Sequence, residues 1–98
     1  MELTSKQRRY LRGKAHHLKP VIIIGKIEFN QSVINTVDNA LKSHELIKIK
    51  FNHYKDIKKE IINKINNKIQ SHPIGFIGNI AIIFRQNSDL DKRIYNID

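Results

Sequence analysis

Four consecutive aliphatic residues, Val21-Ile22-Ile23-Ile24, stand between Pro20 and Gly25. All four are β-branched, which favours a strand, and the proline before them prevents a preceding helix from continuing into the run. Because no polar residue alternates with them, the run is typical of a strand that is buried on both faces. We therefore predict a strand over 21–24 at the centre of a sheet.

The segment before this strand has the pattern of an amphipathic helix. Thr4 is followed three residues later by Gln7, which is the spacing of a capping box. Three apolar residues then recur at the spacing of one helix face: Leu11, Ala15 and Leu18. This pattern predicts a helix over about 5–17 that packs through a single apolar stripe.

Helical spacing recurs twice further along the chain. Asn30 is a favourable N-cap residue, and the apolar residues after it predict a second helix that ends near Ser43 or His44. Isoleucines repeat at helical spacing from Ile57 to Ile69 and predict a third helix over about 55–70.

Strand patterns separate and follow these helices. Residues 46–51 alternate, with Leu46, Lys48 and Lys50 on one face, so we expect a half-exposed strand. The two lysines either contact phosphate or prevent strand aggregation. Two short apolar runs, 74–77 and 80–84, flank Gly78-Asn79 and predict a hairpin.

The predicted order is helix, strand, helix, strand, helix, strand, strand. Strand-helix-strand connections imply parallel pairing with a right-handed crossover, and the hairpin adds an antiparallel strand. We therefore predict an α/β fold, a two-layer sandwich with a four-stranded mixed sheet. One domain is expected over 1–86, followed by a loosely held polar tail over 87–98.

Positive charge is concentrated at the start of the chain. Seven lysines and arginines and a single acid, Glu2, lie within residues 1–26, so this stretch carries +6 of the chain's formal charge of +9. Helical geometry groups four basic side chains away from the apolar stripe: Lys6, Arg9, Arg12 and His16. Such a cluster without acids favours contact with phosphate over the alternative of an ordinary solvated helix face.

Three segments, in order, resemble a known family. They are Ser5 to Gly25, His44 to Lys50, and Ile77 to Arg85. The first includes the run Leu18-Lys19-Pro20-Val21. The last begins with Ile-Gly, continues with an apolar strand and ends with Phe-Arg. They resemble the CRM domain in its bacterial single-domain, YhbY-like form. The resemblance implies RNA binding on large-ribosomal-subunit precursors, with plant relatives that act in group II intron splicing. It also implies a fold like the C-terminal domain of translation initiation factor three.

One part of the chain departs from this family. Its Gly-x-x-Gly loop corresponds here to Gly25-Lys26-Ile27-Glu28, so a glutamate replaces the second glycine. Glycine lets a backbone approach a phosphate closely, whereas Glu28 adds a side chain and a negative charge. The candidate RNA-binding residues are Lys6, Arg9, Arg12, His16, Lys19, Gly25, Lys26 and Arg85.

Other chemistry has little support in the sequence. The chain has no cysteine and no His-x-x-x-His spacing, so we expect no metal site, and no catalytic motif or cofactor signature is present. Tyr10 and Phe29 could stack on bases, but packing is the expected role of both. The longest aliphatic run is four residues and no signal-peptide pattern is present, so we expect a cytoplasmic protein that does not span a membrane.

The sequence thus predicts a monomeric, non-enzymatic protein that contacts structured ribosomal RNA and acts in large-subunit assembly, without a small-molecule substrate. The alternative is a protein-interaction module that docks on a ribosomal protein or an assembly enzyme. A membrane-surface binder is disfavoured by the thin apolar stripe of the first helix.

Overall fold

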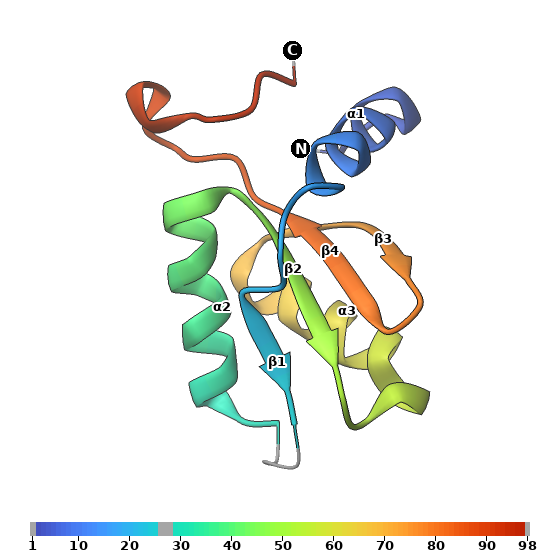
Figure 1. Cartoon of the computed structure of the whole chain (residues 1–98). Helices are drawn as coiled ribbons and strands as arrows, with labels where there is room; N and C mark the ends of the chain where they lie inside the picture. Colours follow the sequence, from blue (N-terminus) through green and yellow to red (C-terminus); the bar gives the residue numbers. More distant parts are fainter. Residues whose placement is uncertain (1, 26–28, 98) are drawn as a thin grey trace.

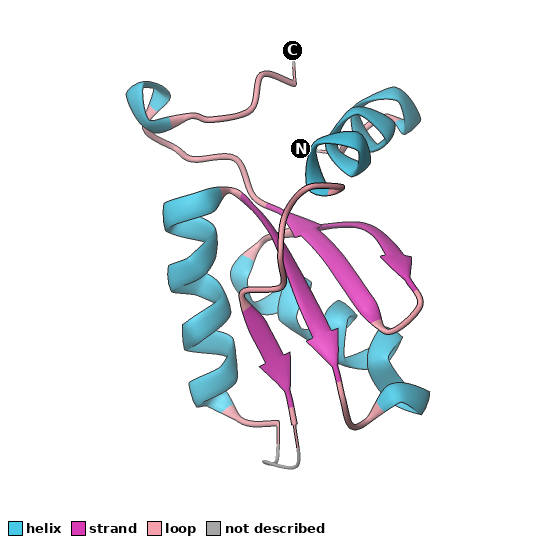
Figure 2. Cartoon of the chain, viewed as in Figure 1, coloured by secondary structure: helices cyan, strands magenta, loops and turns pink. Residues whose placement is uncertain are grey.

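The computed structural model describes residues 2–25 and 29–97. In these residues the chain forms three α-helices and one four-stranded sheet (Figures 1 and 2). The elements in chain order are α1 Ser5–Ala15, β1 Ile22–Ile24, α2 Gln31–His44, β2 Leu46–Phe51, α3 Lys58–Ile69, β3 His72–Ile77 and β4 Ile80–Phe84. A 3₁₀ turn over Lys55–Ile57 leads into α3. Another, Leu90–Lys92, lies in residues 85–97, which follow β4 and which we call the C-terminal segment.

The sheet has the order β1-β2-β4-β3. β1 pairs in parallel with β2, and β4 pairs antiparallel with both β2 and β3. The hairpin turns at Gly78, whose φ of +57° lies in the left-handed region that glycine adopts without strain. The hairpin inserts β4 between β2 and β3. The predicted α/β class, element order and mixed sheet are confirmed.

The predicted central, doubly buried position of the 21–24 strand is wrong. Within the described residues β1 is an edge strand that pairs with β2 alone, and Ile23 is 59% exposed while Ile24 is 3% exposed. An unbroken aliphatic run shows that either face can be buried, but not that both are covered. Here α2 and α3 cover one face of the sheet, and α1 lies over the far end of the other (Figure 1).

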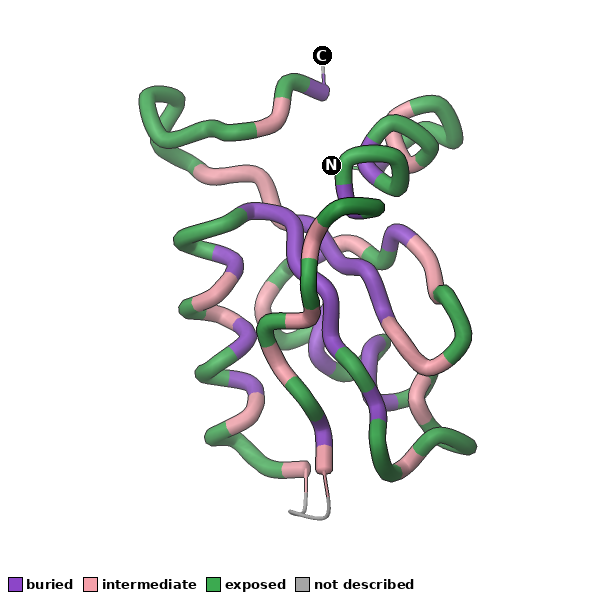
Figure 3. The backbone as a smooth tube through the Cα atoms, viewed as in Figure 1, coloured by how far each residue is buried: buried purple, intermediate pink, exposed green. Residues whose placement is uncertain are grey.

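The sheet carries a hydrophobic cluster on each face. Its two central strands, β2 and β4, are mostly buried (Figure 3). Toward α2 and α3, the larger cluster includes Ile47, Ile49 and Phe51 of β2, as the alternation predicts. On the opposite face, Leu46 packs with Leu11 and Ala15 of α1. α1 with the C-terminal segment thus forms a partial third layer.

The predicted half-exposure of β2 is wrong for most of the strand, because this third layer covers it. Leu46 is 1% exposed and Lys48 only 7%. Lys50, which lies beyond the reach of α1, is exposed.

The C-terminal segment is docked, not loosely held as its polar composition suggests. Ile97 is 5% exposed, and the ring of Tyr95 meets Phe84 edge-on with a centroid distance of 6.4 Å. The buried carboxylate of Glu45 accepts hydrogen bonds from the backbone N–H groups of Asn87, Ile94 and Tyr95. A buried carboxylate needs such donors, so Glu45 fixes the path of this segment.

Candidate nucleic-acid interface

α1 packs on the sheet through one side, and both of its ends are capped or held by hydrogen bonds. Leu11 and Ala15 are fully buried. At the N-terminus, the Thr4 hydroxyl accepts from the Gln7 N–H, and the Gln7 side chain accepts from the Thr4 N–H, so the predicted capping box is confirmed. The side of α1 opposite Leu11 and Ala15 faces solvent.

The C-terminal end of α1 is fixed by Lys48 of β2. Its ammonium donates to the backbone carbonyl of Leu18 at 2.9 Å and to that of His16 at 3.4 Å. A positive charge beside the C-terminus of a helix complements the helix dipole. The sequence left two roles open for Lys48, contact with phosphate and prevention of strand aggregation. Neither fits the structure, because the side chain is buried and holds the end of α1.

The charged side chains on the solvent side of α1 are all basic. The helix contains five lysines and arginines and no acid. In the part of the chain that the structure describes, the ion pairs join Asp38 to Lys42 and to Arg85, and neither involves α1. The exposed basic side chains here are Lys6, Arg9, Arg12, Lys14, His16 and His17. Positive charge on α1 is therefore available to a ligand.

A shallow groove of about 540 Å³ runs along this side of α1. It is lined by Lys6, Arg9, Tyr10, Gly13, Lys14 and His17. A Cβ added at Gly13 would have no heavy atom of another described segment within 4 Å, so the backbone there is open to an approaching group. We call this feature the α1 groove. It has the cationic walls and accessible backbone that suit a phosphodiester chain.

The structure divides the four residues predicted on this helix. Lys6 and Arg9 line the α1 groove. Arg12 is exposed but leans toward β3, where its Nη1 donates to the carbonyl of Ile74 at 3.3 Å. His16 is exposed at the C-terminal end of α1, and its ring lies 5.2 Å from that of His17, which lines the groove. The basic surface therefore extends from the groove toward β3.

Arg8 lies on the flank of α1 that faces β3 and is partly buried. Its charge acts on His72 of β3. Burial, with a smaller contribution from Arg8, holds the pKa of His72 below its ordinary value of 6.5. His72 is therefore neutral near pH 7, and it adds no charge to this surface.

Lys19 and Gly25 lie on either side of β1. Lys19 is exposed and borders a depression between the segment after α1 and the C-terminal segment. β1 runs away from α1 (Figure 1), and Gly25 follows its last residue. The three residues of this strand span about 10 Å, so Gly25 is separate from the α1 groove. Lys26 and Glu28 lie outside the described residues.

Arg85 faces α2 and α3 and binds the protein itself. Its Nη1 donates to the Asp38 Oδ1 at 2.6 Å and to the carbonyl of Ile69 at 2.9 Å. Its Nη2 donates to the Asp38 carbonyl at 3.0 Å. The hydrogen bond from Arg85 is the main cause that lowers the pKa of Asp38, with Lys42 contributing less. These contacts link α2, α3 and β4, and they give Arg85 a structural role.

Sequence reasoning missed Tyr10, Lys14 and His17 as parts of the groove. The missed signal is the spacing of Lys6, Tyr10 and Lys14, which recur every four residues and so form one stripe. The Lys14 ammonium lies 5.5 Å from the centre of the Tyr10 ring. Packing, the role expected for Phe29, is confirmed, because its ring lies against the larger core cluster.

Comparison with known proteins identifies the family. The model of the CRS1 / YhbY (CRM) domain matches residues 3–85. This chain belongs to the CRM domain family. The match covers α1, the sheet and both helices on its other face, so the α1 groove is part of the CRM domain itself.

Individual relatives agree with this assignment. An "RNA-binding protein" of Haemophilus influenzae is 35% identical over 88 residues, which cover 89% of each chain. A "Probable RNA-binding protein" of Methanocaldococcus jannaschii is 40% identical over 95 residues, covering 93% of this chain and 69% of that one. The solution structure of a Staphylococcus aureus protein is 32% identical, with a TM-score of 0.77 over 97% of this chain and all of that one.

These names describe RNA-binding proteins and not enzymes, in agreement with the non-enzymatic interpretation. Within residues 2–25 and 29–97, no three His, Asp or Glu side chains gather as metal ligands do. None of the helices in that part of this CRM domain is long and apolar enough to cross a membrane.

Proposed function

We propose that this CRM domain binds structured RNA along α1 and acts, as a monomer, in the assembly of the large ribosomal subunit. The observation that carries the proposal is the cationic side of α1, which forms no ion pair within the described residues and where Lys6, Arg9 and Lys14 line one groove. The names of the relatives point to the same class of ligand.

In this proposal the α1 groove holds one RNA strand by its phosphates. The flanking side chains extend the contact: Arg12 toward β3, and His16 and Lys19 at and beyond the C-terminal end of α1. Contacts with phosphates position a nucleic acid but carry no sequence information. The groove therefore selects RNA by the path of its backbone, which differs between folded RNA and B-form DNA.

Gly25 is a second, separate contact in this proposal. A Cβ added there would meet no heavy atom of residues 2–25 and 29–97 within 4 Å, so Gly25→Ala leaves the packing of these residues unchanged. If an RNA phosphate approaches the backbone at this position, the added methyl group weakens binding several-fold. Equal affinities of wild type and Gly25→Ala in fluorescence anisotropy would remove Gly25 from the interface and leave the α1 groove untouched.

A salt titration tests RNA binding. Fluorescence anisotropy with a folded ribosomal RNA fragment and with duplex DNA of equal length is measured between about 50 and 300 mM salt. Each phosphate contact contributes a slope of about 0.7 to 0.9 to the fall of log K with log salt. We expect a steep slope and tighter binding of the RNA. Equal binding of both nucleic acids would show a nonspecific polycation, and no binding would favour a protein partner.

The assembly role is tested separately. In sucrose gradients of a cell extract at low salt, we expect the protein to sediment with precursors of the large subunit and to leave them at high salt. Sedimentation at the top of the gradient, with RNA binding intact in the titration, would refute the assembly role. A sedimentation-equilibrium mass of twice 11.5 kDa would refute the monomer.

A further inference from the structure

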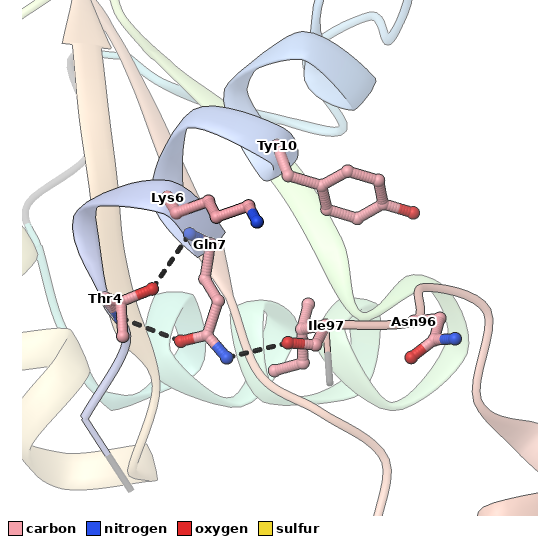
Figure 4. A pocket seen from close by; sticks show the side chains of 6 residues that line it. All are labelled: Thr4, Lys6, Gln7, Tyr10, Asn96 and Ile97. Carbon is pink, nitrogen blue, oxygen red and sulfur yellow. Dashed lines mark hydrogen bonds between the residues drawn. The ribbon is translucent and has the colours of Figure 1, made fainter.

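A second hollow lies beside the α1 groove, between the first turns of α1 and the end of the C-terminal segment. Its volume is about 320 Å³, at the lower end of the range for small-molecule sites. It is lined by Thr4, Lys6, Gln7, Tyr10, Asn96 and Ile97 (Figure 4). Lys6 and Tyr10 line both the hollow and the α1 groove. A ligand in the groove can therefore extend a group into the hollow.

Tyr10 presents an aromatic surface between the two depressions. It is 39% exposed, and it belongs to neither hydrophobic cluster of the described residues. Figure 4 shows its ring extending from α1 over the segment that carries Asn96 and Ile97. Packing, the role expected from the sequence, does not account for this exposure. An exposed aromatic beside cations is the arrangement on which unpaired nucleic-acid bases stack.

The hollow is preformed by contacts within the protein. Gln7 accepts from the Thr4 N–H at 2.8 Å, and its Nε2 donates to the Ile97 carbonyl at 2.7 Å. Ile97 is itself buried, and Glu45 holds the backbone of the same segment at Ile94 and Tyr95. A ligand therefore meets a wall that is already ordered, which lowers the entropic cost of binding.

The rim of the hollow supplies polar groups suited to the edge of a base. The amide of Gln7 has a second N–H besides the one that binds Ile97, and the Thr4 hydroxyl has a proton to donate. The Lys6 ammonium lies at the entrance, beside Tyr10 (Figure 4). The hollow thus combines a stacking surface, hydrogen-bonding groups and a cation for the adjoining phosphate.

We propose that the hollow is a nucleobase site, in which a single unpaired RNA base stacks on Tyr10 while its flanking phosphates contact Lys6 and Arg9. This inference rests on the proposed function and adds to it the feature that the RNA must contain. A fully paired helix keeps its bases stacked inside, so it fills the α1 groove and leaves the hollow empty. The protein therefore prefers RNA with an unpaired nucleotide beside a helical segment.

The test uses two RNA hairpins, one fully paired and one with a single bulged nucleotide. The bulged nucleotide is 2-aminopurine, whose fluorescence reports stacking. Wild type is compared with Tyr10→Ala, which removes the ring, and with Tyr10→Phe, which keeps it. Stacking on one aromatic is worth on the order of 5- to 150-fold in affinity. Because Tyr10 is outside the core, both variants are expected to melt at the wild-type temperature in circular dichroism.

We expect wild type and Tyr10→Phe to bind the bulged hairpin more tightly and to quench 2-aminopurine. Tyr10→Ala should bind both hairpins with the affinity of wild type for the paired one. Equal binding of both hairpins by wild type, or an unchanged preference in Tyr10→Ala, would overturn the nucleobase site. If binding were still steeply salt-dependent in that case, the proposed function would stand. Absence of salt-dependent binding to either hairpin would overturn both.

Discussion

α1 and α3 are both rich in basic residues, yet the fold uses their charges differently. On α3, acids lie among the lysines, with Asp56 just before the helix and Glu60 within it. Lys58 at the start of α3 donates to the Gly78 carbonyl at 2.9 Å and to the Asn79 side chain at 3.2 Å. α1 has no acid, and Lys6, Arg9 and Lys14 line one groove. A basic helix indicates a polyanion site where neither the helix nor the fold supplies partners for its charges.

The same contrast holds between the two faces of the sheet. On the face of α2 and α3, Arg85 and Lys42 are paired with Asp38, so these cations stabilise the protein. On the face of α1, Lys48 is buried against backbone carbonyls, whereas Lys6 and Arg9 stand in solvent. A buried lysine with a structural role and exposed lysines thus occur on one face of the sheet. Substitutions can separate them.

The largest effect is expected from charge reversal on α1 compared with α3. The double variant Arg9→Glu with Lys14→Glu should weaken RNA binding on the order of 100-fold and reduce the salt slope by about 0.7 to 0.9 per lost contact. The matched control, Lys59→Glu with Lys68→Glu, makes the same change in net charge on exposed residues of α3. Anisotropy titrations that gave equal losses for both pairs would show that only the net charge matters.

The two lysines of β2 should differ in their effect on stability. Lys48→Met leaves the carbonyls of His16 and Leu18 without their buried donor, and it should lower the free energy of unfolding by about 2 kcal/mol. Lys50→Met, on the exposed end of the same strand, should change it by less than about 0.5 kcal/mol. Urea denaturation measures both variants. Similar values for the two would contradict the structural role of Lys48.

A smaller effect is expected from the ion pair on the opposite face. Because the pKa of Asp38 is lower in the folded protein than its ordinary value of 3.8, the pair stabilises the fold above that pH. Its contribution is lost as the pH falls below 3.8 toward the folded pKa. Asp38→Asn should cost about 1 kcal/mol at neutral pH and remove this part of the acid dependence.

A measurement of RNA affinity distinguishes the structural role of this ion pair from the proposed role of the α1 groove. Thermal melts of wild type and Asp38→Asn are compared between about pH 2.5 and pH 7, a range that begins about one unit below the ordinary pKa of an aspartate. Its affinity for RNA at pH 7 should equal that of wild type. A large loss of affinity in a fully folded variant would place the face of α2 and α3 in the interface.

The smallest effect is expected at Gly13, where stability and binding should change in opposite directions. Alanine is favoured over glycine within a helix by about 0.5 to 1 kcal/mol, and a Cβ here meets no neighbouring atom. Gly13→Ala should therefore raise the melting temperature and, if RNA lies against the floor of the groove, weaken binding a few-fold. A more stable variant with unchanged affinity would show that RNA passes above the floor.

Much of the fold could be read from local patterns. The helix starts at Thr4 and Asn30 are confirmed as N-caps, and the alternation in β2 correctly separated Ile47 and Ile49 from Lys48 and Lys50. Capping bonds join residues two or three apart, and helix and strand periods are set by the backbone. Such features need no knowledge of what packs on the element. The basic cluster on α1 was predictable for the same reason.

The availability of these residues to a ligand, in contrast, depends on tertiary packing. The sequence placed Arg85, Gly25 and Arg9 together as candidates, but the fold pairs Arg85 with Asp38 and sets Gly25 at the far end of β1 from α1. The fold also places β1 at the edge of the sheet, where the sequence predicted a central strand. A side chain's charge is fixed by its own chemistry, whereas its burial and its partners depend on distant segments that pack over it. The sequence therefore determined where the charge lies along the chain, and the packing of α1, the hairpin and the C-terminal segment determined which charges face solvent.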